Sequence, residues 1–184
     1  MGSYKLNKNK IILDICGGTG AWSQPYREAG YDVRVIDLKY GDDAIIFQNI
    51  GRAYGVLAAP DCSRLAGCAA YLWTDENLRF SLALADACLR IAVLHNPEFW
   101  ALENPVGRLR KYYGDPTLIF NPCDYGDPYT KKTLLWGMFN IPKRKRVKPV
   151  EGSKMHKLPP SKDRKTIRAI TPPGFARAFF EANR

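Results

Sequence analysis

The sequence predicts an α/β fold built on a doubly wound, mostly parallel sheet. The first observation is a βαβ pattern: an apolar run at residues 11–16 leads through GGTG into the helical stretch WSQPYREAG and then into YDVRVIDL. The second is that more apolar runs follow at residues 54–60, 99–105 and 130–139, with a long helical segment between two of them. Strands that alternate with helices favour a parallel sheet covered on both faces.

Two helices have clear boundaries in the sequence. The first is expected from about residue 75 to residue 95, because proline disfavours helix at the residue before it and Asn96-Pro97 follows. A terminal helix is expected in TPPGFARAFFEAN, opened by its prolines. The buried face of the longer helix is predicted from apolar residues at spacings of three and four, namely Leu78, Leu82, Ala85, Leu89, Ala92 and Val93.

The size and composition indicate one domain, residues 1–184, without a membrane segment. The chain has 184 residues, of which 46% are hydrophobic, enough for a single core. No apolar run approaches the roughly 20 residues that cross a bilayer, and MGSYKLNKNK lacks the apolar stretch of a signal peptide. A soluble protein in the cytoplasm of a bacterial or phage-infected cell is expected. The five scattered cysteines and two histidines predict neither a disulfide framework nor a metal site.

The net charge of +10 is concentrated in one part of the sequence. Residues 143–168 contain eleven Lys or Arg against Glu151 and Asp163, which gives +9 in that window alone. Such a concentration is typical of a surface that binds a phosphate backbone, and the alternative is a solvated basic loop. The cations predicted to contact nucleic acid are Lys132, Lys143, Arg144, Lys145, Arg146, Lys154, Arg164 and Lys165.

Polar residues follow the predicted strands, where a doubly wound sheet binds its ligands. Asp14 and the glycine turn end the first strand, Asp37 ends the second, Asp61 and Cys62 follow the run at 54–60, and Glu103 and Asn104 end the run at 99–105. Asp37 has the position of a ribose-binding acid. The alternatives are structural: a glycine turn that only allows close packing, a buried thiol at Cys62 and a capping acid at Glu103.

The set LDICGGTGAW, APDCS and LENPVGRL resembles the DNA cytosine carbon-5 methyltransferases, particularly their short phage versions, over most of the chain. The resemblance implies the Rossmann-like fold of the S-adenosylmethionine-dependent methyltransferases. It also implies S-adenosylmethionine as cofactor, S-adenosylhomocysteine as product and DNA as partner. The residues that it implies for cofactor binding are Asp14, Cys16, Gly17, Gly18, Thr19, Gly20, Trp22, Asp37, Leu38, Asn49, Ile50 and Pro60.

The resemblance further implies Cys62, Glu103 and Lys131 as catalytic residues. Carbon 5 of cytosine is a poor nucleophile until a group adds to carbon 6, and a thiolate is suited to add there reversibly. A carboxyl group with a raised pKa can hold the ring nitrogen 3 as charge develops. Cys62 and Glu103 match these two roles, and no metal is required.

Three departures from the family pattern leave alternatives open. Asp61 stands where the family has a second proline, and its charge opposes ionisation of Cys62. Tyr129, Lys131 and Thr133 align with the family's glutamine and two arginines, so one cation remains. A short basic insert at about residues 141–168 replaces the target-recognition domain. The same chemistry on RNA or on a free cytosine nucleotide, or a catalytically degenerate nucleic-acid-binding module, are therefore alternatives.

Overall fold

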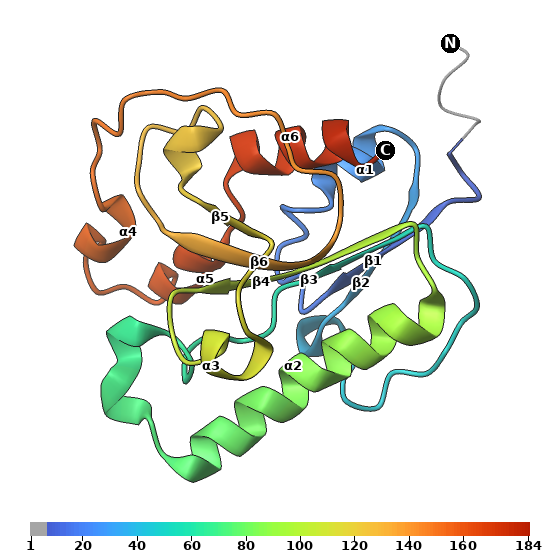
Figure 1. Ribbon diagram of the computed structural model, residues 1–184, viewed down its shortest axis with the longest axis horizontal. Helices are drawn as coiled ribbons and strands as arrows, with labels where there is room; N and C mark the ends of the chain where they lie inside the picture. Colours follow the sequence, from blue (N-terminus) through green and yellow to red (C-terminus); the bar gives the residue numbers. More distant parts are fainter. Residues whose placement is uncertain (1–6) are drawn as a thin grey trace.

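The computed structural model describes residues 7–184, and they form one sheet with helices on both of its faces (Figure 1). The strands are β1 (Ile11–Ile15), β2 (Asp32–Ile36), β3 (Gly55–Ala58), β4 (Phe99–Pro105), β5 (Leu118–Phe120) and β6 (Thr133–Met138). The α-helices are α1 (Gln24–Glu28), α2 (Asp75–His95), α3 (Arg110–Tyr113), α4 (Lys154–Lys157), α5 (Arg164–Ala169) and α6 (Pro173–Ala182). Three short 3-10 helices are η1 (Leu38–Tyr40), η2 (Gly67–Leu72) and η3 (Pro122–Asp124).

The six strands are ordered β2-β1-β3-β4-β6-β5. β2, β1, β3 and β4 are mutually parallel, whereas β6 runs antiparallel to both of its neighbours. The predicted α/β class and the mostly parallel sheet are therefore confirmed, with one reversed strand near the edge. The sequence did not predict β5, which has only three residues.

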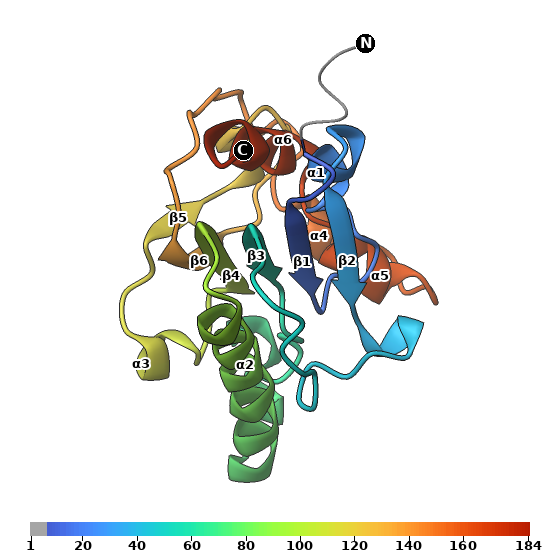
Figure 2. The same cartoon turned by 90° about the vertical axis from the view of Figure 1, so that its right-hand side faces the viewer.

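Helices cover the two faces of the sheet in separate layers (Figure 2). On one face, Leu13, Val56 and Leu102 pack with Ala85 and Ile91 of α2. On the other face, strand residues such as Ile12 and Leu57 pack with α1 and α6, through an aromatic cluster of Trp22, Tyr26, Phe99, Phe175 and Phe179. Successive strand residues thus point into different cores, as the pleat requires.

Helix α2 begins and ends at the predicted residues. The Thr74 side chain caps its first turn by accepting a hydrogen bond from the Asn77 backbone, and Asn96 ends it with a left-handed backbone conformation. Ala85 and Ala92 are buried as predicted, but Val93 is 78% exposed. The prediction for Val93 was wrong because Ala92 and Ile91 already occupy the buried face, and the next residue turns about 100° away.

The basic stretch contains two short helices, α4 and α5, inside otherwise irregular backbone. Its first part lies beside the sheet edge, because the backbone amides of Lys145 and Val147 donate hydrogen bonds to carbonyls of η3. Its second part reaches the carboxyl ends of the strands (Figure 1). Among residues 7–184, no helix has both the length and the apolar character that a membrane span requires.

The aromatic core predicts a large loss of stability when Phe179 is truncated. Phe179 is 0% exposed and contacts the rings of Trp22, Phe99 and Phe139. Phe179→Ala should lower the free energy of unfolding by about 3–5 kcal/mol, as measured by urea denaturation. Leu94→Ala, at a position that is 46% exposed, is the control and should change it by less than about 0.5 kcal/mol. Equal effects of the two variants would contradict this packing.

Candidate active site

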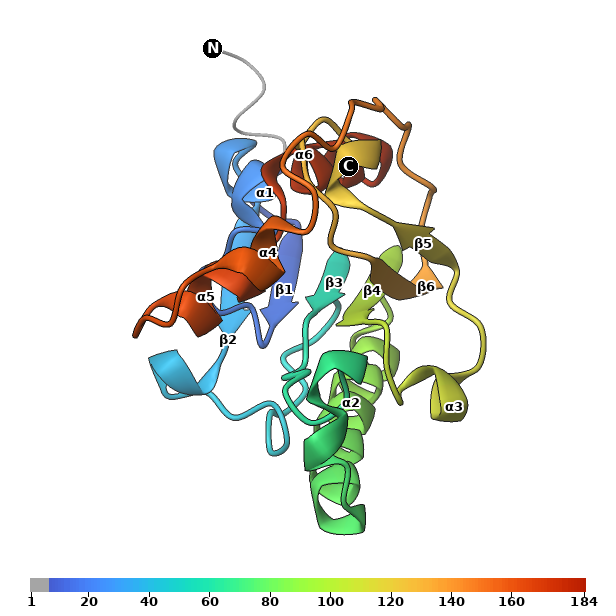
Figure 3. The same ribbon diagram turned by 90° about the vertical axis from the view of Figure 1, so that its left-hand side faces the viewer.

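The carboxyl ends of the parallel strands form one edge of the sheet (Figure 3), and three residues that are distant in the sequence meet there. Cys62 follows β3, Glu103 lies near the end of β4, and Lys131 precedes β6. β6 begins at this edge because it is antiparallel to β4, with Thr133 opposite Pro105. The charges of Glu103 and Lys131 both act on the Cys62 thiol. The three predicted catalytic residues therefore share one site.

A buried asparagine ties the end of β4 to the segment that carries Cys62. Asn104 is 0% exposed, and its side-chain amide donates a hydrogen bond of 3.2 Å to the Pro60 carbonyl oxygen. This bond fixes the backbone two residues before Cys62 against the strand that carries Glu103. Asn104 thus holds the loop of one candidate residue, Cys62, beside the strand that carries the other, Glu103.

Backbone contacts hold the rest of the cysteine loop, residues 59–67, against the segment after β4. Ala66 and Gly107 form an isolated antiparallel bridge, and the Arg108 amide donates to the Leu65 carbonyl at 2.8 Å. A Cβ at position 107 would overlap that carbonyl, so the approach requires glycine. The glycine in the sequence VGRL, Gly107, is therefore explained by the close approach of the two backbones.

The Cys62 thiol is half-buried and lies in an unfavourable electrostatic field. Burial, the charge of Glu103 and the charge of Asp61 raise the pKa of Cys62 to about 11, while Lys131 acts in the opposite direction. The thiol is therefore protonated at neutral pH in the free protein. Formation of a thiolate there requires a change in the charge around it.

Glu103 lines a narrow pocket at the same edge. Burial raises the pKa of Glu103, and the nearby Lys131 ammonium partly opposes this shift. The raised pKa favours the neutral carboxylic acid, which can donate a hydrogen bond as well as accept one. The pocket's other lining residues are Phe120, Lys131, Thr133, Ala169, Thr171, Pro172 and Phe175.

Asp61 is turned toward its own loop and toward the basic segment. Its carboxylate accepts hydrogen bonds from the Ser63 amide at 3.1 Å and the Ser63 hydroxyl at 2.7 Å. It also lies 3.8 Å from the Lys165 ammonium of α5. Asp61 nevertheless contributes to the raised pKa of Cys62, so these partners do not remove its influence.

The glycine turn after β1, residues 17–20, lies directly over a buried carboxylate. Asp14 is 1% exposed, and its Oδ2 accepts a hydrogen bond of 2.5 Å from the Ser23 hydroxyl. A Cβ on Gly17 would contact this carboxylate, so the turn can approach it only as glycine. Burial raises the pKa of Asp14 to about 6. Among the described residues, Asp14 Oδ1 has no hydrogen-bond partner.

Asp37, at the end of β2, is bonded to the same turn. Its Oδ2 accepts from the Gly18 amide and its Oδ1 from the Lys39 amide, both at 2.9 Å. A carboxylate has about four acceptor positions, which leaves capacity for ribose hydroxyls. Tyr40, which the sequence reasoning did not select, donates from its hydroxyl to the Gly18 carbonyl at 3.1 Å. Leu38 is 75% exposed beside Asp37.

These features fit a cofactor that carries both an ammonium group and a ribose. The unpartnered oxygen of buried Asp14 can accept a hydrogen bond from an ammonium, because a buried charged or polar group requires such a partner. Asp37 can accept from two hydroxyls, and the backbone at Gly18 and Gly20 has the positive φ values that an open glycine turn requires.

The structure does not bring all predicted cofactor residues to this edge. Trp22 is 2% exposed and packs on Phe175 and Phe179, so it belongs to the core. Asn49 and Ile50 lie beside the end of α2, where the Ile50 amide contacts His95, at the amino end of the strands.

The structure also places Cys16 and Asp42 relative to the glycine turn. Cys16 faces away from the turn's open side, because its thiol contacts Cys88 of α2. Asp42 lies nearer to the turn than Asn49 does, since its amide donates to the Asp37 carbonyl at 3.2 Å. An acid six residues after the strand's end was the available sequence pattern for this position.

The predicted nucleic-acid cations separate into two groups. Arg144 bonds the Ile119 carbonyl and Arg146 pairs with Asp124 at 3.4 Å, so the first group lies along the β5 border. The second group lies on α4 and α5, where Lys154 pairs with Glu151 and Lys165 with Asp61. The cations on α5 are therefore the ones closest to the cysteine loop. The remaining predicted cations, Lys132, Lys143 and Lys145, are exposed.

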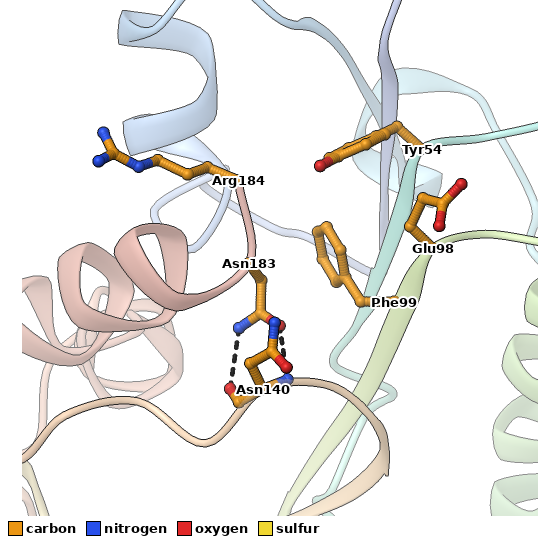
Figure 4. A pocket seen from close by; sticks show the side chains of 6 residues that line it. All are labelled: Tyr54, Glu98, Phe99, Asn140, Asn183 and Arg184. Atoms are coloured by element: carbon orange, nitrogen blue, oxygen red, sulfur yellow. Dashed lines mark hydrogen bonds between the residues drawn. The ribbon is translucent and has the colours of Figure 1, made fainter.

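A second hollow lies at the opposite edge of the sheet (Figure 4). Tyr54 and Phe99 line it at the amino ends of β3 and β4, and Asn140 is bonded to Asn183 across its floor. None of the predicted site residues is among those that line it.

No family model and no curated protein matches the sequence. The fold is similar to the crystal structure of a proposed DNA modification methyltransferase encoded within a prophage of E. coli, with a TM-score of 0.52 and 17% identity. The match covers 84% of this chain and 50% of that one, so the chain spans about half the length of its structural neighbour. At this identity the likeness shows the fold alone, a Rossmann-like α/β fold with a mostly parallel sheet.

The field around Cys62 predicts a steep pH dependence of its alkylation. With a pKa of about 11, the thiolate fraction and the rate with iodoacetamide should rise about tenfold per pH unit between pH 7 and 10. Asp61→Asn removes one of the charges that raise this pKa, so it should accelerate alkylation at pH 8. Peptide mass analysis reports the Cys62 adduct, with Cys62→Ala as the blank. A rate that is already constant above pH 8 would contradict this interpretation.

The close approach at Gly107 predicts that this position does not accept a side chain. Gly107→Ala should displace the cysteine loop, lower the free energy of unfolding by about 1–3 kcal/mol and change the alkylation rate of Cys62. Val106→Ala, at the adjacent position that is 50% exposed, is the control. Wild-type stability together with an unchanged Cys62 rate in Gly107→Ala would show that the two backbones are not held together in this way.

Proposed function

We propose that the protein transfers a methyl group from S-adenosylmethionine to carbon 5 of cytosine in DNA, through a covalent adduct with Cys62. The observation that carries this proposal is the convergence of Cys62, Glu103 and Lys131 at one strand edge, next to a glycine turn over a buried carboxylate. The fold of the proposed prophage DNA modification methyltransferase supports the same class of reaction.

The cofactor would be held at the ends of β1 and β2. The Asp14 carboxylate would accept from its amino group, Asp37 would accept from its ribose hydroxyls, and Leu38 and Tyr40 would cover one side. S-adenosylmethionine supplies an electrophilic methyl group on a sulfonium. Everything else in the reaction depends on how the chain holds and activates the cytosine.

Cys62 and Glu103 would act on opposite sides of the cytosine ring. The Cys62 thiol would pass its proton, directly or through water, to the Glu103 carboxylate, and its sulfur would form a bond to carbon 6. The π pair of carbon 5–carbon 6 would then move between carbons 4 and 5, and the π pair of carbon 4–nitrogen 3 onto nitrogen 3. Glu103, whose raised pKa favours the protonated acid, donates a hydrogen bond to nitrogen 3 and stabilises the developing charge. Carbon 5 then becomes nucleophilic and accepts the methyl group. The cofactor would leave as S-adenosylhomocysteine. Water would take the carbon-5 proton, whose bonding pair would re-form the carbon 5–carbon 6 double bond as the Cys62 sulfur leaves with its own pair and the aromatic ring is restored.

Lys131 would stabilise the anionic steps of this cycle. Its ammonium acts on both the Cys62 thiol and the Glu103 carboxyl, and in each case it favours the deprotonated form. It replaces a family arginine with a point charge, so it can supply electrostatic attraction without the bidentate geometry of a guanidinium.

A nucleic-acid polymer is favoured over a free nucleotide by the charge distribution. The cations of α5 reach the cysteine loop through Lys165, and the excess charge of +9 at residues 143–168 exceeds what one phosphate requires. RNA is the alternative polymer substrate for the same chemistry. Few side chains are available to identify several base edges, so short sequence specificity is expected.

A catalytically degenerate nucleic-acid-binding module is the second candidate. Asp61 favours it, because its charge beside Cys62 raises the pKa of the nucleophile and no partner cancels this effect. Under this alternative the chain binds nucleic acid and transfers no methyl group, and Asp61→Pro restores the family pattern and activity.

The decisive experiment is transfer of a labelled methyl group from S-adenosylmethionine to DNA, RNA and a cytosine nucleotide. Wild type should label DNA, Cys62→Ala should label nothing, and Glu103→Gln should be slower by about 10²–10⁴-fold because the acid is lost. Cys123→Ala, at a partly buried thiol within η3, is the matched control and should keep wild-type activity. An oligonucleotide with 5-fluorocytosine should trap wild type as an adduct on Cys62.

The alternatives give different results in the same assay. An inactive wild type together with an active Asp61→Pro variant would support the degenerate module. Labelling of RNA alone or of the nucleotide alone would show that this molecule, and not DNA, is the substrate. Full activity of Cys62→Ala would overturn the covalent mechanism.

A further inference from the structure

Three aromatic side chains are exposed on the surface next to the cysteine loop. Tyr71 of η2 is 83% exposed, Phe80 of α2 is 53% exposed, and Trp73 between them is 36% exposed. None of them belongs to either hydrophobic core of the described structure. Such a group of rings on a strongly charged protein indicates a binding surface.

Two arginines lie over these rings. The guanidinium of Arg64 is 4.8 Å from the centre of the Phe80 ring, and that of Arg108 is 5.3 Å from the Trp73 ring. Arg108 also reaches the Thr74 carbonyl at 3.5 Å. We call these five residues, Arg64, Tyr71, Trp73, Phe80 and Arg108, the aromatic–arginine surface.

The aromatic–arginine surface adjoins the cysteine loop. Arg64 follows Cys62 by two residues, and the amide of Arg108 bonds the Leu65 carbonyl of the cysteine loop. The short helix η2 and the basic helix α5 lie at the same end of the molecule (Figure 1). They are in contact, since Arg168 of α5 reaches the Cys68 sulfur at 3.8 Å. A strand bound at Cys62 would therefore have aromatic rings beside it as well as cations.

The combination of rings and guanidinium groups is suited to nucleotides. An aromatic ring stacks on the face of any base, and an arginine can stack on a base or contact a phosphate. An acidic peptide would use the arginines but would leave the rings without stacking partners. The chain's net charge of +10 also favours a polyanion.

Stacking on these rings requires bases whose faces are free. In a duplex each base face is covered by its neighbours, so only a single-stranded segment can use the surface. We propose that the aromatic–arginine surface binds unpaired nucleotides that flank the target base, and that single-stranded DNA is the substrate form. This inference rests on the proposed function, which identifies the target base as a cytosine. The binding itself can be measured without any methyl transfer.

The test measures the affinity of Cys62→Ala protein for a fluorescent single-stranded DNA oligonucleotide and for the matching duplex. In this background, Tyr71→Ala, Trp73→Ala and Phe80→Ala should each weaken single-strand binding by about tenfold, and duplex binding should change little. Val93→Ala is the matched control, because it removes an exposed apolar side chain from the other end of α2. Circular dichroism and urea denaturation establish that each variant is folded.

Tryptophan fluorescence gives a second measurement on the same complexes. Trp73 should be quenched by the single strand because a base stacks on it, and Trp73→Phe should keep the affinity within about threefold while it loses the quenching.

The outcomes separate this inference from the proposed function. Equal losses in single-strand and duplex affinity, or no loss in any ring variant, would overturn the inference even if wild type methylates DNA. Conversely, selective loss of single-strand affinity supports the surface even if no methyl group is transferred.

Discussion

The candidate site depends on one topological constraint, the direction of the strands at a single edge of the sheet. Parallel β3 and β4 deliver Cys62 and Glu103 to their carboxyl ends. Lys131 reaches the same edge for the opposite reason: it precedes a strand, and that strand is antiparallel. If β6 were parallel, Lys131 would lie at the other edge of the sheet. The hydrogen bond of Asn104 and the bridge at Gly107 are local contacts. They fix the cysteine loop within the arrangement that the strand directions define.

The electrostatics of Cys62 and Glu103 make their protonation states interdependent. An ionised Glu103 raises the pKa of Cys62, and a neutral Glu103 removes that effect. Transfer of one proton from the thiol to the carboxyl leaves the total charge unchanged and produces the thiolate and the neutral acid together. These are the two forms that addition to cytosine requires. In the free protein, burial and Asp61 keep the proton on the thiol, so a bound base would have to shift this balance. Lys131 opposes part of that cost, because its ammonium favours the negative charge on either group.

The sequence predicted those parts of the fold that depend on local pattern. The strands before the glycine turn and before Cys62, and both ends of α2, follow from apolar runs and from Asn96-Pro97. An apolar run does not indicate whether a strand is parallel or antiparallel to its neighbours, so the reversed direction of β6 was not predictable. β5 has only three residues, which is too few to show a periodic pattern.

Some of the residues predicted for the site lie away from the carboxyl edge of the strands, because spacing along the sequence does not determine position in the fold. Trp22 follows the glycine turn but packs under α6, because its ring completes the aromatic core. Asn49 lies in a loop that runs to the amino edge, and spacing along an irregular loop does not define where it ends. The basic stretch was predicted as one unit, but backbone bonds to η3 hold its first part at the β5 border. Cys62 and Glu103 were predictable from residue pattern because each stands at the end of an apolar run, whereas Lys131 was selected only through the family resemblance.

The cations of α5 and the aromatic–arginine surface would contribute to binding affinity in different ways, depending on the form of the nucleic acid. The cations of α5 attract phosphates from any strand, and this attraction weakens with salt. The rings at positions 71, 73 and 80 require exposed base faces, and stacking is much less sensitive to salt. A small protein that combines the two can hold one strand firmly without identifying many base edges. Because a target base in a single strand does not have to be extracted from a duplex, such a protein also avoids the unpairing energy that base flipping requires. The proposed chemistry and the proposed single-strand binding would therefore draw on neighbouring surfaces of one sheet edge.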